Sequence, residues 1–158
     1  MAEKAFQDFY PDQLSHCYGC GRLNTEGLQI KSDWDGEESV CEYTPKLFHT
    51  AFPGYVYGGL IASLMDCHGT GTASAAAYRA EGRKMDTSPP LRFLTGSQHV
   101  DFLQPTPIEG TLMVRSRVKE IKGRKVVVTL ELHAGGQVCA RGEVVAIQVP
   151  EDWVSGMR

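Results

Sequence analysis

The sequence predicts an α+β protein in which a curved antiparallel β-sheet wraps around one long central helix. Two observations carry this prediction. Residues 58–79 form a long helical segment whose side chains are apolar or small on nearly every side, and a helix of that kind is buried all round. Most of the remaining chain consists of extended segments bounded by turn residues, which indicate antiparallel strands. With one long helix available, a sheet that surrounds it is the economical architecture.

The elements follow one another in a simple order. A short helix is expected over residues 3–14 and a loop over residues 15–27. The segments "GLQIKSDW" and "ESVCEYTP" favour two strands joined by a turn at "DGE". An irregular loop leads into the helix, and "EGRKMDTSPP" is a polar linker after it. Further strands, with "KGR" and "AGGQ" as turns and a peripheral tail behind them, are expected at 91–103, 108–121, 124–134 and 137–149.

Composition narrows the class of protein. The chain has 158 residues, of which 42% are hydrophobic and 22% charged, which fits a single globular domain over residues 1–158. No apolar run reaches membrane-spanning length, and a net charge of -3 argues against nucleic-acid binding. The start, "MAEKAFQDFYPDQL", lacks the basic patch and apolar stretch of a secretory signal. Together with five cysteines, an odd number, this favours reduced thiols and a cytoplasmic location.

The segment "CYGCG" has the Cys-x-x-Cys spacing of zinc and redox sites. A closed zinc site needs four ligands, and no second pair with zinc-ribbon spacing follows. His16 could be a third ligand, but the fourth would have to come from a distant part of the chain. We therefore predict a glycine-punctuated turn with small buried thiols and no metal, with a metal site as the weaker alternative.

The segment "YGGLIASLMDCHGTG" places Asp66 and His68 in a helix that is otherwise suited to burial. An unpaired buried charge is costly, so Asp66 has partners, is solvated, or takes part in chemistry. Without further information, the favoured interpretation is a structural carboxylate bonded to strand N–H groups. Residues two apart on a helix do not face each other, so His68 is interpreted as a satisfied core histidine or a pocket wall.

Four segments together resemble one known family. "YGGLIASLMD" resembles its His-Gly-Gly helix start with an acidic residue further on, and "VDFLQPTPIEGTLMV" resembles its strand end and following strand. "CARGEVVAI" is similar to the closing strand, and "CYGCGRLNTEGLQI" to the entry segment of many members. The family is the hotdog-fold thioesterases of the PaaI-like group, related to hydroxybenzoyl-CoA thioesterases. The resemblance implies a hotdog fold and an acyl-CoA thioesterase, with coenzyme A as part of the substrate and no separate cofactor.

The resemblance also implies roles for individual residues. Asp66 would be the catalytic carboxylate, the backbone N–H of Gly58 would bind the thioester carbonyl, and Thr95 would help to place the water. The chain departs from the family pattern at two positions: Tyr57 stands where the family usually has histidine, and Ala51 where some members have asparagine. The substrate-binding candidates, which adjoin the helix start or lie in the loop before it, are Tyr57, Gly59 and His49.

Thioester hydrolysis requires few groups. The leaving thiol has a pKa near ~8.5 and departs without a strong acid, so a base or nucleophile and an oxyanion donor suffice. The N–H groups at the start of a helix suit the oxyanion. Asp66 would either activate a water or attack the carbonyl to give an anhydride, and both routes stay open. Cys67 has no evident base beside it, so a thiol nucleophile is not expected.

Helix geometry adds a constraint on the oligomeric state. Asp66 lies eight residues after Gly58, which is ~12 Å along a helix. One carbonyl cannot contact both groups of the same helix, so a shared site in a two-fold homodimer is expected, with pairing of dimers into tetramers left open. The alternatives are a hotdog dehydratase or hydratase and a non-catalytic acyl-CoA-binding regulatory dimer. Two basic segments, around 119–125 and 79–84, compete as sites for coenzyme A phosphates. The alternative for the first is a solvated hairpin edge that discourages aggregation, and neither segment is assigned.

Overall fold

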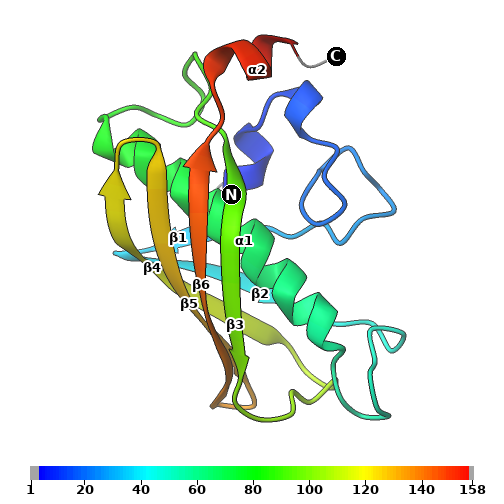
Figure 1. The fold of residues 1–158 in the computed structure, drawn as a ribbon. Helices are drawn as coiled ribbons and strands as arrows, with labels where there is room; N and C mark the ends of the chain where they lie inside the picture. Colours follow the sequence, from blue (N-terminus) through cyan, green and yellow to red (C-terminus); the bar gives the residue numbers. More distant parts are fainter. Residues whose placement is uncertain (1–3, 157–158) are drawn as a thin grey trace.

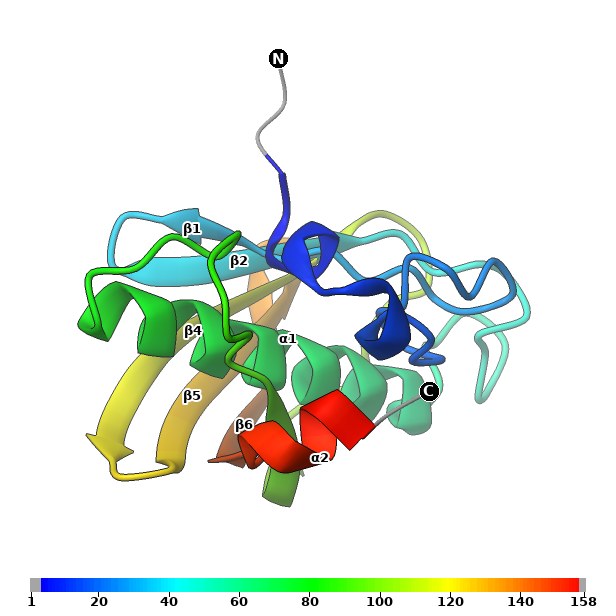
Figure 2. The same cartoon turned by 90° about the horizontal axis from the view of Figure 1, so that it is seen from above.

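The computed structural model describes residues 4–156 and confirms the central helix and the curved antiparallel sheet. Helix α1 (Gly58–Ala80) packs against the sheet (Figure 1), and the strands curve around it when viewed from above (Figure 2). The order across the sheet is β1-β2-β4-β5-β6-β3, with every neighbouring pair antiparallel. The strands are β1 (Asp33–Asp35), β2 (Glu38–Tyr43), β3 (Phe93–Phe102), β4 (Leu112–Lys122), β5 (Lys125–Ala134) and β6 (Gln137–Gln148).

The core lies between α1 and the long strands. Leu64 and Met65 of the helix are fully buried, as is Val144 on strand β6. The small residues of α1 have a direct purpose, because a Cβ atom on Gly69 would lie only 2.9 Å from the Val144 side chain. Helix and sheet therefore approach more closely at this point than any side chain at residue 69 would permit.

The strands on the C-terminal side match the expected hairpins. The β4–β5 hairpin closes at Gly123 with φ 60°, and the β5–β6 hairpin at Gly135 and Gly136, with φ 57° and 78°. Such positive φ values favour glycine, which is why "KGR" and "AGGQ" were informative turn signals. Strand β4 begins later than expected, because Ile108 donates its N–H to Gly54 in the loop before the helix instead of joining the sheet.

The prediction of one helix over residues 3–14 is wrong. The chain instead forms two short 3-10 helices, η1 (Phe6–Phe9) and η2 (Asp12–Leu14). Pro11 separates them, and both Tyr10 and Pro11 have extended backbone angles. Proline lacks an N–H donor and disfavours helical angles in the residue before it, which explains the break. Residue 3 lies outside the described part of the chain.

The first expected strand is also mostly wrong, because only Asp33–Asp35 joins the sheet. The residues before it pair with the loop that contains Cys17 and Cys20, which we call the cysteine loop. The N–H of Leu28 donates to the Tyr18 carbonyl at 2.8 Å, and that of Ile30 to the Gly19 carbonyl at 3.0 Å. Gln29 between them has φ 59°, which ordinary strands do not use. This segment therefore packs against the cysteine loop and does not extend the sheet.

The tail is peripheral, as expected, but it contains a short helix, α2 (Glu151–Gly156), that buries Val154. Among residues 4–156, none of the helices combines the length and the apolar character that a membrane span requires.

Candidate active site

The Asp66 carboxylate lies between α1 and the edge strand β3. Asp66 is half-buried, and its Oδ1 accepts a hydrogen bond from the Thr95 hydroxyl. The register of β3 against β6 shifts between Thr95 and Ser97, which marks a β-bulge, and bulges re-aim side chains beside active sites. Within residues 4–156, no strand N–H donates to the carboxylate, which differs from the structural interpretation of Asp66. The structure brings two of the three candidate catalytic residues together.

The third candidate, Gly58, opens helix α1. Tyr57 is the N-cap residue, with φ -60° and ψ 130°, and no side chain caps the first turn. The first N–H groups of a helix have no intrahelical acceptor. Within the described residues, the N–H groups of Gly58 and Gly59 are thus available to an outside acceptor, and the helix dipole favours a negative one.

Two aromatic rings flank these N–H groups. A Cβ on Gly58 would lie 3.4 Å from the Phe102 ring, and a Cβ on Gly59 would lie 2.2 Å from the Tyr57 ring. Both aromatic side chains are more than half exposed. Sequence reasoning identified Tyr57 as a candidate but missed Phe102, which is 45 positions away on strand β3. The result is an open, apolar rim around a pair of hydrogen-bond donors.

Within one chain, Gly58 and Asp66 do not meet. Both belong to the same continuous helix, and eight residues at 1.5 Å each separate them by ~12 Å. Strand β3 lies beside Asp66 and is an edge strand, paired only with β6 among the described strands. Its central residues are exposed, and Gln98 binds across to the Ala62 carbonyl of α1 at 2.9 Å.

His49 is tied to the helix start through its backbone. Its carbonyl accepts the Tyr57 N–H at 2.8 Å. Its imidazole accepts the Lys46 N–H on Nδ1 at 3.0 Å and packs edge-on against Phe48. Partial burial and the nearby Lys46 charge lower the pKa of His49. The structure shows this side chain engaged within its own loop, and its contact with substrate stays a prediction.

His68 is a buried core histidine, in agreement with the first of its two interpretations. Its Nδ1 lies 2.8 Å from the Ser32 hydroxyl, and its Nε2 lies 2.9 Å from the Ser116 hydroxyl and 3.3 Å from that of Ser39. Complete burial lowers the pKa of His68 to about 4, so the ring is neutral at pH 7. Both ring nitrogens are occupied by serine hydroxyls, so His68 is not a partner of Asp66.

The basic segments are largely engaged within the protein. On the β4–β5 hairpin, Lys119 and Lys125 pair with Glu143 and Glu120, and Arg124 donates to the Gln148 carbonyl. At the end of α1, Arg79 stacks on Trp34 and Arg83 pairs with Glu81. His99 pairs with Asp101 on the exposed side of β3. None of these contacts assigns a site for coenzyme A phosphates.

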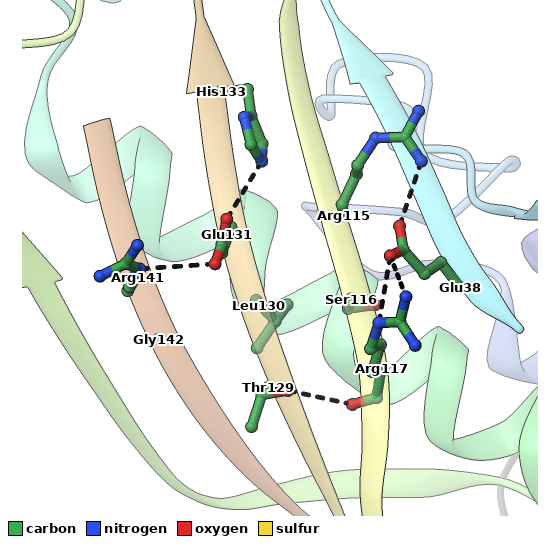
Figure 3. Close-up of a pocket in the computed structure, with 10 residues that line it drawn as sticks. All are labelled: Glu38, Arg115, Ser116, Arg117, Thr129, Leu130, Glu131, His133, Arg141 and Gly142. Atoms are coloured by element: carbon green, nitrogen blue, oxygen red, sulfur yellow. Dashed lines mark hydrogen bonds and ion pairs between the residues drawn. The ribbon is translucent and has the colours of Figure 1, made fainter. Parts of the chain in front are cut away.

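A charged pocket of about 450 Å³ lies on the face of the sheet opposite α1 (Figure 3). Glu38 pairs with Arg115 and Arg117, and these two guanidinium groups lower the pKa of its carboxyl group. Glu131 pairs with His133 and Arg141 in the same way. Carboxylates and guanidinium groups pair across neighbouring strands, so this pocket is interpreted as surface ion pairing.

Cys67, the residue after Asp66, faces the cysteine loop. Its sulfur lies 3.9 Å from that of Cys17, and Cys20 completes a cluster in which the three sulfur atoms lie within 4.8 Å of one another. Sequence analysis weighed only His16 as a third ligand and missed Cys67, because 47 positions separate Cys67 from Cys20. The cluster lies outside the catalytic machinery described above.

A long helix wrapped by a curved sheet, with an acidic residue at mid-helix facing an edge strand, is the arrangement of hotdog-fold proteins. Comparison with known proteins defines the family. Residues 53–141 match the model of the Thioesterase superfamily, which is more than half of the chain. A thioesterase superfamily protein from Shewanella loihica is 46% identical, with 89% of this chain and 100% of that chain covered and a TM-score of 0.68. The chain belongs to the thioesterase superfamily.

More distant relatives extend the comparison. The E. coli PaaI protein from the phenylacetic acid degradation operon shares the fold, with a TM-score of 0.63 at 17% identity over 78% of this chain and 81% of that chain. The acyl-coenzyme A thioesterase THEM4 of Rattus norvegicus is 26% identical over 113 residues, which cover 72% of this chain and 43% of the relative. The chain thus spans less than half the length of that relative.

Proposed function

We propose that this protein hydrolyses acyl-CoA thioesters at a site shared by two subunits of a homodimer. Asp66 acts as the base, and the N–H of Gly58 from the partner chain holds the developing oxyanion. The observation that carries the proposal is the half-buried Asp66 carboxylate, held by Thr95 in a mostly buried helix of a thioesterase-superfamily chain. The acyl-CoA substrate class is supported by the name of the THEM4 relatives.

The arrangement of Asp66 suits a base. Thr95 engages one carboxylate oxygen, which orients the group and leaves the second oxygen for a water. As that water bonds to the thioester carbonyl carbon, its proton passes to Asp66, and the carbonyl oxygen becomes an oxyanion. Collapse of the tetrahedral species breaks the C–S bond and releases coenzyme A as a thiolate, because a thiol with a pKa near ~8.5 is an adequate leaving group.

A direct attack by Asp66 would instead form an acyl anhydride that water then opens. The two routes differ in the source of the oxygen in the product. A single turnover in H₂¹⁸O places the label in the released acid if water attacks the thioester. The anhydride route, when water opens it at the Asp66 carbonyl, transfers an unlabelled Asp66 oxygen to the acid and leaves the label on the protein.

The dimer follows from the ~12 Å between Gly58 and Asp66 along one helix. The open edge of β3 lies beside Asp66, and a second copy docked there by a two-fold axis would place the two α1 helices side by side and antiparallel. Exposed apolar side chains of this region, Tyr57, Leu94, Phe102 and Leu103, would be covered by the partner or by the acyl group. The five free cysteines fit a reducing, cytoplasmic setting.

The structure disfavours the dehydratase alternative. That chemistry commonly uses a histidine and an acid that converge on one carbon, whereas both nitrogens of His68 are engaged by serine hydroxyls in the core. Tyr57 and Ala51 stand at positions where the family commonly has other residues, which leaves the acyl-CoA-binding regulatory dimer as an alternative. The activity measurement below distinguishes this regulatory dimer from a thioesterase.

The experiment is a thiol-release assay over aromatic and aliphatic acyl-CoAs, with parent protein, Asp66→Asn and the control Asp152→Asn. Asp152 is an exposed carboxylate on α2, far along the chain from the site. We expect Asp66→Asn to lower kcat by at least ~10², the scale of a lost general base, while Asp152→Asn retains the parent rate. Saturable binding of acyl-CoA without thiol release from any substrate would support the regulatory dimer instead.

A further inference from the structure

The cysteine cluster is built from two distant parts of the chain. Cys17 and Cys20 lie in the loop after η2, and Cys67 lies on α1. All three are free thiols; Cys20 and Cys67 are buried, whereas Cys17 is exposed. Sulfur atoms bound to one zinc ion at ~2.3 Å lie about 3.8 Å apart in tetrahedral geometry. The observed 3.9 Å between Cys17 and Cys67 already matches this spacing.

The loop backbone is shaped around the sulfur atoms. A Cβ on Gly19 would lie 2.3 Å from the Cys67 sulfur, so the space that a side chain would need belongs to that thiol. The N–H of Gly21 closes the turn by donating to the Cys17 carbonyl at 2.8 Å. The turn thus holds Cys17 and Cys20 beside Cys67 of α1, so three thiols that can bind metal as thiolates face one another.

A second observation points to a missing negative partner. The Nη1 atom of Arg92 and the hydroxyl of Tyr10 are buried and have no hydrogen-bond partner within residues 4–156. The Arg92 guanidinium lies over the Tyr10 ring at 4.3 Å and within Coulomb range of the three cysteines. A cation with a buried, unpartnered Nη1 atom is stabilised by an anion nearby. Three neutral thiols do not supply one.

We infer that Cys17, Cys20 and Cys67 form a three-thiolate zinc site that fastens the cysteine loop to helix α1. Each thiol loses its proton to solvent on binding, so Zn²⁺ with three thiolates carries a net charge of minus one, which the Arg92 guanidinium balances. Within residues 4–156, no fourth histidine, cysteine or carboxylate joins the cluster. Water takes the fourth position on the exposed side at Cys17. This replaces the metal-free turn expected from the sequence.

The test uses the full chain, stripped of metal by a chelator under reducing conditions, reloaded with Zn²⁺ and freed of excess by gel filtration. Elemental analysis should find about one zinc per chain in the parent. Cys67→Ser and Cys17→Ser should each lose nearly all of it. Cys17 is exposed, so its variant keeps the test valid even if Cys67→Ser fails to fold.

Two controls separate the cluster from other thiols and ligands. Cys139→Ser changes a buried cysteine elsewhere in the sheet and should retain zinc. His16→Ala removes the ligand weighed from the sequence and should also retain it. Co²⁺ in place of Zn²⁺ should show thiolate-to-cobalt charge-transfer absorption in the parent and in both controls.

The inference fails if the reloaded parent holds no zinc, or if Cys17→Ser holds as much as the parent. It also fails if His16→Ala loses the metal, because the site would then not be built from three thiolates. Reaction with iodoacetamide gives an independent measure: Cys17 should be alkylated in the stripped protein and protected in the zinc-loaded protein. Equal alkylation in both states would count against the site.

Discussion

Heterodimer complementation tests whether Gly58 and Asp66 of different chains build one site. The structure suggests a clean change at each group. Gly58 is the first helical residue, where proline is well tolerated, and Tyr57 before it already has the extended angles that proline requires (φ -60°, ψ 130°). Gly58→Pro therefore removes the N–H donor while the helix start is kept. Gly58→Ala is the matched control, because its Cβ would lie at an ordinary 3.4 Å from Phe102 and the N–H remains.

The magnitudes follow from the number of lesions in each site. Loss of one oxyanion donor costs ~10² to 10³ in kcat, and loss of a general base ~10² to 10⁴, so each homodimer should retain about 1% or less. In a mixed dimer of Gly58→Pro and Asp66→Asn chains, shared sites put both lesions in one site and none in the other. The heterodimer should then recover about half of the parent kcat, one of two sites.

The assay uses two differently tagged chains that are co-expressed and isolated by sequential affinity steps. Thiol release is then measured with the best acyl-CoA. A dimer of Gly58→Ala and Asp66→Asn chains should behave similarly and shows that tagging and assembly do not limit activity. If the Gly58→Pro heterodimer is assembled by size-exclusion yet as inactive as its parents, each site is built within one chain, and the ~12 Å argument is refuted.

Three further predictions concern single residues. Burial lowers the pKa of His68 in the folded protein to about 4 from an ordinary 6.5. Between these two pH values the unfolded state therefore binds more protons than the folded state. In urea unfolding, the stabilisation from neutral His68 should be complete above pH 6.5, and the free energy of unfolding should fall by roughly 3 kcal/mol as the pH drops to about 4. Thr95→Val should lower kcat about tenfold with little change in KM, as expected for a residue that positions Asp66, and Thr95→Ser should restore the rate; equal losses in both variants would contradict a role for the hydroxyl. Gly69→Ala should lower Tm, because overpacking against Val144 at 2.9 Å costs ~1–3 kcal/mol and exceeds the gain in helix propensity; an unchanged or higher Tm would show that the sheet moves aside freely.

The parts of the fold that were predicted correctly depend on local signals. Strand β4 follows from its alternating polar and apolar residues, and β5 and β6 follow from the turns before them, whose glycines have positive φ. Helix α1 follows from its uniform apolar and small composition. These patterns are properties of neighbouring residues, so the sequence displays them directly.

The incorrect predictions share one physical cause, because residues far away in the sequence supply the contacts that local patterns would assign to neighbours. Ile30 is apolar and fully buried, as a strand residue would be, but its N–H bonds to the loop at Gly19 and not to the sheet. Cys67 meets Cys17 for the same reason, through the path of the loop across α1. Asp66 could be selected as a site residue because a carboxylate conflicts with its apolar helix, whereas Cys67 is an ordinary buried residue type and gives no such signal.

Four consecutive helix residues, Met65–His68, show how the fold sets the position of the carboxylate. Successive helix positions point about 100° apart, so each of the four faces different surroundings. Met65 packs against Gly142 of β6, and His68 binds Ser116 of β4. Cys67 meets Cys17 in the loop, and Asp66 meets Thr95 at the sheet edge. Three of these contacts fix the rotation of α1 about its axis, and that rotation determines where Asp66 points. A zinc ion bound to Cys67 would therefore help to fix the orientation of the neighbouring Asp66 without touching the substrate.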